Sequence, residues 1–169
     1  MALYGLRSLH SDHPEVIQLV ASLVPIVRAC SERMSPQEMV NAIYGMHNMR
    51  SDKEEVKRLV VALLPKIRDS AIEPWTGQAV ALALHGLQHM HSEHPEVLRL
   101  VSALIPIVRD CKGQWKSHDV GMALAGLRSL SSEQPKVRQL VATITPMVRS
   151  CVKELTPVNL GTALYGLRG

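Results

Sequence analysis

Aromatic side chains are scarce in this sequence: phenylalanine is absent, and aromatic residues make up 3% of the 169 residues. Long apolar stretches are absent too, because Lys or Arg interrupts every hydrophobic run before the roughly 18 to 20 residues that a bilayer-spanning helix needs. The sequence also lacks a glycine-rich phosphate loop, a nucleophile elbow and paired carboxylates beyond those expected at helix caps. We therefore predict a chain with no membrane span, no enzymatic activity, no cofactor and no small-molecule substrate.

Cysteine is scarce as well. The three cysteines, Cys30, Cys111 and Cys151, are 81 and 40 residues apart. An odd number spread along the chain is a poor disulfide framework, so we expect small buried apolar residues in a reducing compartment. The first residues show neither the apolar core of a signal peptide nor the Arg- and Ser-rich lead of a transit peptide. We expect that no leader exists or that it lies upstream.

The composition fits one continuous domain, since 46% of the residues are hydrophobic. The net charge of +4 and the pI near 9.2 are a mild bias that suits an anionic partner. Three of the eight histidines, His89, His91 and His94, lie close together in sequence. No cysteine or carboxylate set with zinc-ligand spacing accompanies them, so we expect no metal site.

Five glycines recur every 40 or 41 residues: Gly5, Gly45, Gly86, Gly126 and Gly166. A period near 40 is typical of solenoids, whose units bury their apolar faces against each other. We therefore predict an all-α fold, a right-handed α-solenoid of about four ~40-residue helix-turn-helix repeats. The whole chain, 1–169, forms a single α-helical repeat domain, with units at about 1–33, 34–74, 75–114 and 115–154 and a partial unit at 155–169.

The first helix of each unit has a recognisable start. In the second unit, Ser35, Pro36 and Glu38 form a capping box with proline at the first helical position. Trp75 and Trp115 occupy the position before the cap in the next two units, where an apolar staple explains them better than a ligand platform does. Glycine inside a helix costs about 0.5 to 1 kcal/mol relative to alanine, so we expect the repeated glycine to allow close approach of a neighbouring helix.

The second helix of each unit is expected to open at a serine followed by an acidic residue. Each of these helices also contains a proline that should bend or end it about one turn later. The serines are Ser11, Ser51, Ser92 and Ser132, and the prolines are Pro25, Pro65, Pro106 and Pro146.

The segment SerProGlnGluMetValAsnAlaIleTyrGlyMet at 35–46 resembles the signature helix of the octotricopeptide and heptatricopeptide repeat proteins. Members of that family are solenoids of helical pairs that act mostly on RNA in chloroplasts and mitochondria. The resemblance implies single-stranded RNA as a ligand and an organellar location. The segment IleGluProTrp at 72–75 only echoes another family segment, and the C-terminal RAP-type domain is not visible, so a protein scaffold in a large assembly is the alternative.

Variable positions on the first helix form the candidate binding stripe, because residues three to four apart share a helix face. Planar and amide side chains that vary on a constant scaffold suit base recognition, while a solvated surface under no constraint is the alternative. The candidate residues are Tyr4, Arg7, Asn41, Tyr44, His47, His85, Gln88, Arg128 and Tyr165, with Asn48 beside them and Arg168 at the C-terminal end.

One arginine per unit follows the internal proline: Arg28, Arg68, Arg109 and Arg149. These residues are candidates for phosphate binding at the spacing of the repeat. A cation in the last turn of a helix also favours the negative end of the helix dipole, which is the structural alternative. Both ends of the chain carry AlaLeuTyrGlyLeuArg, which faces the core in interior units, so we expect further repeats or a partner to cover the ends.

Overall fold

The computed structural model describes residues 2–151 and 155–167, and the chain is all-α over these ranges, apart from an isolated bridge between Thr76 and Lys112. In chain order the elements are η1 (Ala2–Ser8, a 3-10 helix), α1 (Pro14–Ala29), α2 (Pro36–Gly45), α3 (Glu54–Ser70), α4 (Gly77–His85), α5 (Pro95–Arg109), α6 (Ser117–Ala125), α7 (Pro135–Arg149) and α8 (Pro157–Gly166). Among the described residues, no helix combines the length and apolar character needed to cross a membrane.

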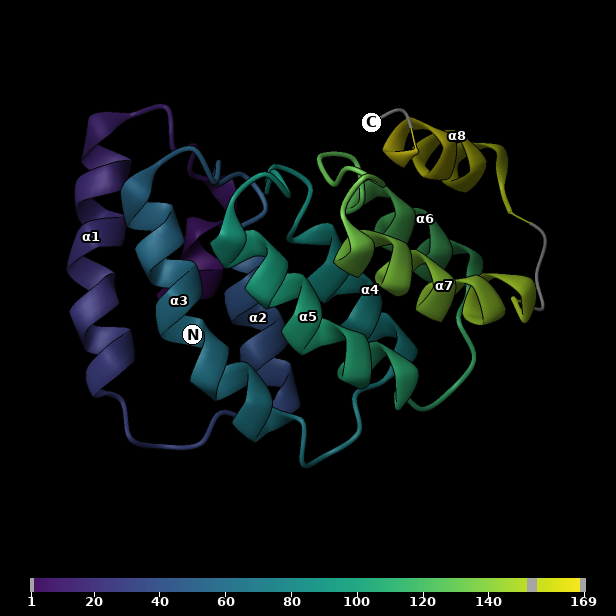
Figure 1. Cartoon of the computed structure of the whole chain (residues 1–169), viewed down its shortest axis with the longest axis horizontal. Coiled ribbons are helices and arrows are strands. Elements are labelled where there is room, and N and C mark those ends of the chain that lie inside the picture. Colours follow the sequence, from purple (N-terminus) through teal and green to yellow (C-terminus); the bar gives the residue numbers. More distant parts are fainter. Residues whose placement is uncertain (1, 152–154, 168–169) are drawn as a thin grey trace.

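The helices form two layers (Figure 1). The short elements η1, α2, α4, α6 and α8, here called the first helices, pack each on the next. The longer helices α1, α3, α5 and α7, called the second helices, likewise pack on one another and form the front layer in Figure 1. Each element therefore makes its main contacts with its counterpart one repeat away.

The start of α2 confirms the predicted capping box. The Glu38 amide donates to Ser35 Oγ at 3.3 Å, and the Ser35 amide donates to Glu38 Oε2 at 2.8 Å. The hydrogen bonds that the Ser35 amide and hydroxyl donate to the Glu38 carboxylate lower the pKa of Glu38. Trp75 and Trp115 are 1% and 2% exposed, as expected of packing residues.

The serines expected to open the second helices have a different role. The residues before α1, α3, α5 and α7 are His13, Lys53, His94 and Gln134, and none of their side chains makes a cap hydrogen bond. Instead, Ser51 Oγ accepts a hydrogen bond of 2.8 Å from the His91 amide in the next unit. Ser11 and Ser92 accept equivalent bonds from Arg50 and Ser131, so these buried serines join neighbouring units. Ser132 is exposed.

Four of the repeated glycines, Gly45, Gly86, Gly126 and Gly166, lie at the ends of their helices and allow the expected close approach. Gly5 instead lies inside η1, where nothing comes within 4 Å of a Cβ built on it. A Cβ atom built on Gly45 would overlap the Leu3 carbonyl group, at 2.7 Å from its carbon atom. Gly86 meets the Ile43 carbonyl in the same way, at 2.8 Å. Gly86 has φ −58°, which any residue can adopt, so the close helix contact is what requires glycine there.

Two further expectations have mixed outcomes. The prolines lie inside the second helices, which end about one turn beyond them, as predicted. The cysteines were expected to be buried, but Cys30 is exposed and Cys111 and Cys151 are half-buried. Cys30 follows α1, where the first unit contributes only the short η1, so less of the first-helix layer covers it.

Candidate ligand-binding surface

Four side chains from three successive units lie in ring-to-ring contact: Tyr4, Tyr44, His47 and His85, called here the ring row. Tyr44, His47 and His85 stack on one another, and Tyr4 is tilted against Tyr44. The Tyr44 ring lies 6.1 Å from that of Tyr4 and 5.1 Å from that of His47, measured between centroids. The His85 ring lies 5.9 Å from Tyr44 and 5.8 Å from His47. All four residues are half-buried, so the row is part of the molecular surface.

Guanidinium groups lie next to the rings. The Arg7 guanidinium carbon is 4.3 Å from the centre of the Tyr4 ring, a cation–π distance. In the C-terminal part of the array, Arg128 covers Tyr165 at 4.8 Å. Ala125 stands in the position of Tyr44 and His85, so the rings are interrupted between these two groups. Arg168 lies outside the described residues.

Two amide side chains of this surface, Gln88 and Asn48, connect units to one another. Gln88 Nε2 donates to the His47 carbonyl at 3.2 Å, and Asn48 Nδ2 donates to the Arg7 carbonyl at 2.8 Å. Asn41 Oδ1 accepts a hydrogen bond of 3.1 Å from Gln37 Nε2 on its own helix. Their amide groups thus contribute to the scaffold, which leaves the rings and the arginines as the groups that distinguish the units.

The histidines of this surface are neutral at physiological pH. Burial lowers the pKa of His47 and His85; the Tyr44 and Met122 carbonyls, respectively, oppose this effect, and the proximity of His47 lowers the pKa of His85 further. Burial, followed by the positive charge of Arg128, also lowers the pKa of His89. The positive charge near the rings therefore comes from arginines.

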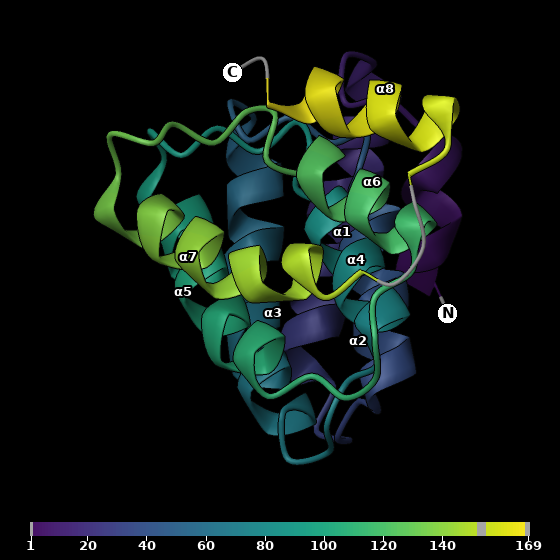
Figure 2. The same ribbon diagram turned by 90° about the vertical axis from the view of Figure 1, so that its right-hand side faces the viewer.

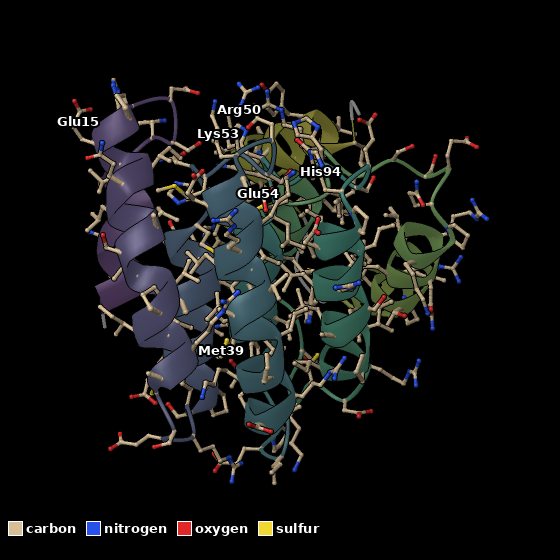
Figure 3. The ribbon with its side chains drawn as sticks, turned by 60° about the vertical axis from the view of Figure 1, so that its left-hand side comes forward. Glu15, Met39, Arg50, Lys53, Glu54 and His94 are labelled. Atoms are coloured by element: carbon tan, nitrogen blue, oxygen red, sulfur yellow. The ribbon has the colours of Figure 1, made fainter. Side chains whose placement is uncertain are left out.

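Arg50 is a cation near this surface that the repeat comparison missed. It lies in the turn between α2 and α3, and its positive charge is close enough to lower the pKa of His89. Its backbone amide donates a hydrogen bond to Ser11 Oγ. Figure 3 shows Arg50 and Lys53 at the end of the layer where α1, α3 and α5 begin, marked by Glu15, Glu54 and His94. The sequence did carry a signal for Arg50: it is a positive charge in a turn, six residues after Tyr44 and three after His47.

The arginines Arg28, Arg68, Arg109 and Arg149, called the arginine row, lie elsewhere. All four are exposed in the last turns of the second helices. Arg68 lies about 20 Å along α3 from Glu54, at a helical rise of about 1.5 Å per residue. Because α3 begins next to the turn that follows the ring row, the structure places the two sets at opposite ends of the units.

Two grooves between second helices are each lined by one residue of the arginine row and by a second arginine. Arg28 and Arg58 line a groove of about 600 Å³ between α1 and α3, together with Glu55. Arg68 and Arg99 line an equivalent groove of about 440 Å³ between α3 and α5. Arg58 and Arg99 occupy the same register after Gly45 and Gly86, a recurrence that could have identified them from the sequence.

A metal site is not formed by the part of the chain that the structure describes: no three of its His, Cys, Asp or Glu side chains come together as a possible ligand set. No protein-family model, curated protein or solved structure matches this chain.

Proposed function

We propose that the chain is a non-catalytic α-solenoid that binds single-stranded RNA along the ring row. The observation that carries the proposal is the continuous row of Tyr4, Tyr44, His47 and His85, with arginines next to it. Single-strand binding combines aromatic surfaces for the bases with cations for the backbone. The organellar location implied by the family resemblance is part of the same proposal.

The ring spacing limits how bases can bind. Inserting a base between two rings requires roughly 7 Å between them, twice the ~3.4 Å stacking distance of nucleic-acid bases. The ring centroids in the row are 5.1 to 6.1 Å apart, and Tyr44, His47 and His85 already stack on one another. We therefore expect bases to lie across the exposed parts of the row and to bond the imidazole and phenol groups, rather than to insert between the rings.

The phosphates are assigned to Arg7, which lies over Tyr4, and to Arg128 and Arg50, which lie near His89. Arg128 also lies over Tyr165. With three phosphate contacts on a single strand, log K should fall with log salt with a slope of about −2. A fourfold rise in salt would then weaken binding roughly 15- to 20-fold. The arginine row is at the other end of the units and is expected to contribute less.

The test is a fluorescence-anisotropy titration with single-stranded RNA at two salt concentrations. Two double variants with the same charge change provide matched arms: R7Q/R128Q removes cations beside the rings, and R109Q/R149Q removes cations from the arginine row. We expect the first pair to weaken binding more and to reduce the salt slope. Equal effects of the two pairs would place the phosphates elsewhere, and no binding at low salt would remove the RNA proposal.

A protein scaffold within a larger assembly is the second candidate. The observation that favours it is the use of Gln88 and Asn48 amides in bonds between units, which leaves fewer groups for base recognition. Under this alternative, the same titration gives no salt-dependent RNA binding. The ring row would then serve as a contact surface for another protein.

A further inference from the structure

The C-terminal member of the first helices, α8, has an uncovered apolar side. Within the described residues its main neighbour is α6, and Figure 2 shows α8 at the near end of the molecule with no helix in front of it. Leu160 is 44% exposed and Leu164 is 60% exposed. The equivalents of Leu160 in the earlier units, Met39, Val80 and Val120, are at most 1% exposed. The side of α8 that is uncovered is thus a buried packing surface in α2, α4 and α6.

The N-terminal second helix, α1, also has an apolar side that lacks a covering helix. Ile26 is 64% exposed, whereas its equivalent in α5, Ile107, is 5% exposed. A pocket of about 250 Å³ lies beside it, lined by Val27, Leu63 and Leu3 among others, where η1 covers only part of α1. Within the described residues, α8 therefore has no second helix packed after it, and α1 has only η1 as a first helix before it.

The two ends also share a sequence and differ in structure. AlaLeuTyrGlyLeuArg occurs at 2–7 and again at 163–168. At the N-terminal end it lies in the 3-10 helix η1, while at the C-terminal end residues 163–166 continue an α-helix that Thr156 caps. Gly45 packs against the carbonyl of Leu3, and Leu164 is the equivalent of Leu3 in α8. The α8 helix carries the same contact residues as η1 and has helical residues 157–162 before them.

We propose that a second copy of this chain covers α8, with α8 of one copy taking the place of η1 in the next. Leu160 would fill the pocket beside Ile26 and Val27, and Leu164 would receive Gly45 as Leu3 does now. Residues 2–6 of η1, which leave, have the same identities as residues 163–167, which replace them, so the gain comes from residues 157–162 of α8. The contact is head-to-tail, so association continues beyond a dimer unless the arrangement closes into a ring.

The test is sedimentation velocity of the 169-residue chain and its variants over a range of concentrations. We expect the wild-type chain to form species larger than dimers as concentration rises. L160E and I26E should each be monomeric, because each removes one of the two complementary surfaces. Mixing them should restore a 1:1 dimer and nothing larger, since each variant retains the surface that the other lacks. Both residues are exposed in the isolated chain, so circular dichroism should show an unchanged fold.

The matched control is I72E, which adds the same charge at a residue that is 72% exposed in the loop between α3 and α4, and it should associate like the wild type. L6A, which removes packing that holds η1 in place, should strengthen association severalfold because η1 must leave. A monomeric wild type, association that survives L160E, or a mixture that stays monomeric would overturn the proposal. Weaker association of L6A would contradict the replacement of η1.

Discussion

The N-terminal and C-terminal halves of the first-helix layer pack alike but present different surfaces. In the N-terminal half, Tyr44 and His85 stack in one row, whereas Ala125 occupies their position in the C-terminal half. The packing glycine is unchanged, because Gly86 and Gly126 both meet a carbonyl group of the preceding first helix. The difference shows that the same packing at the glycine accepts different residues at the position before it.

The largest effect is expected from filling the glycine contact in either half. G86V and G126V should each lower the free energy of unfolding by about 3 kcal/mol, because the new side chain collides with a backbone carbonyl that cannot move aside. G161A is the control: nothing lies within 4 Å of a Cβ at this helical position, so it should gain about 0.5 to 1 kcal/mol. Urea unfolding measures all three. A loss below about 1 kcal/mol in either half would break the similarity of the scaffold.

The serine bonds between units should show a smaller effect of the same kind. S51A and S92A leave the amides of His91 and Ser131 without the hydroxyl that accepts from them, at a cost of about 1 to 3 kcal/mol each. S132A removes a hydroxyl from an exposed serine and should change the free energy of unfolding by less than about 0.5 kcal/mol. Equal values for S51A and S132A would show that the buried bond between units contributes nothing.

The smallest effect, a dependence of stability on pH, should be confined to the half that carries the ring row. The folded state lowers the pKa of His47, His85 and His89, so the unfolded chain binds more protons as the pH falls through about 6.5. Stability should therefore be fully present above that pH and decrease below it. Hydrogen exchange at decreasing pH should show greater opening in α2 and α4 than in α6 and α8, once corrected for intrinsic rates. H85Q should reduce the decrease, and equal opening in both halves would contradict this origin.

Sequence reasoning succeeded where the cause was local or strictly repeated. The Ser35 cap, the helix ends after the prolines and the close glycine contacts all follow from neighbours in sequence or from the period. It failed for Ser51, which resembles a cap but whose partner amide is 40 residues away in the next unit. Gln88 has the same kind of distant partner. Interactions between repeats involve the same residue types as caps and recognition surfaces, so the pattern alone does not separate them.

The stacking of the rings could not be predicted for a related reason. The positions of Tyr44 and His85 were identified as one stripe, but the centroid distance of 5.9 Å depends on how closely successive first helices pack. The exposure of Cys30 was also missed, because it depends on the short η1 next to α1. Both features arise from packing between units.

The most direct test of the proposed function is the affinity for single-stranded RNA of the wild type, Y44A and A125Y, measured in parallel. Y44A should weaken binding by about 1 to 3 kcal/mol for the base that loses its ring, and A125Y, which extends the row toward Tyr165, should strengthen it. S132A, at an exposed serine before the second helix α7, should bind like the wild type. Unchanged affinity in both ring variants would contradict the account, because the residue before each glycine would then have no part in ligand binding.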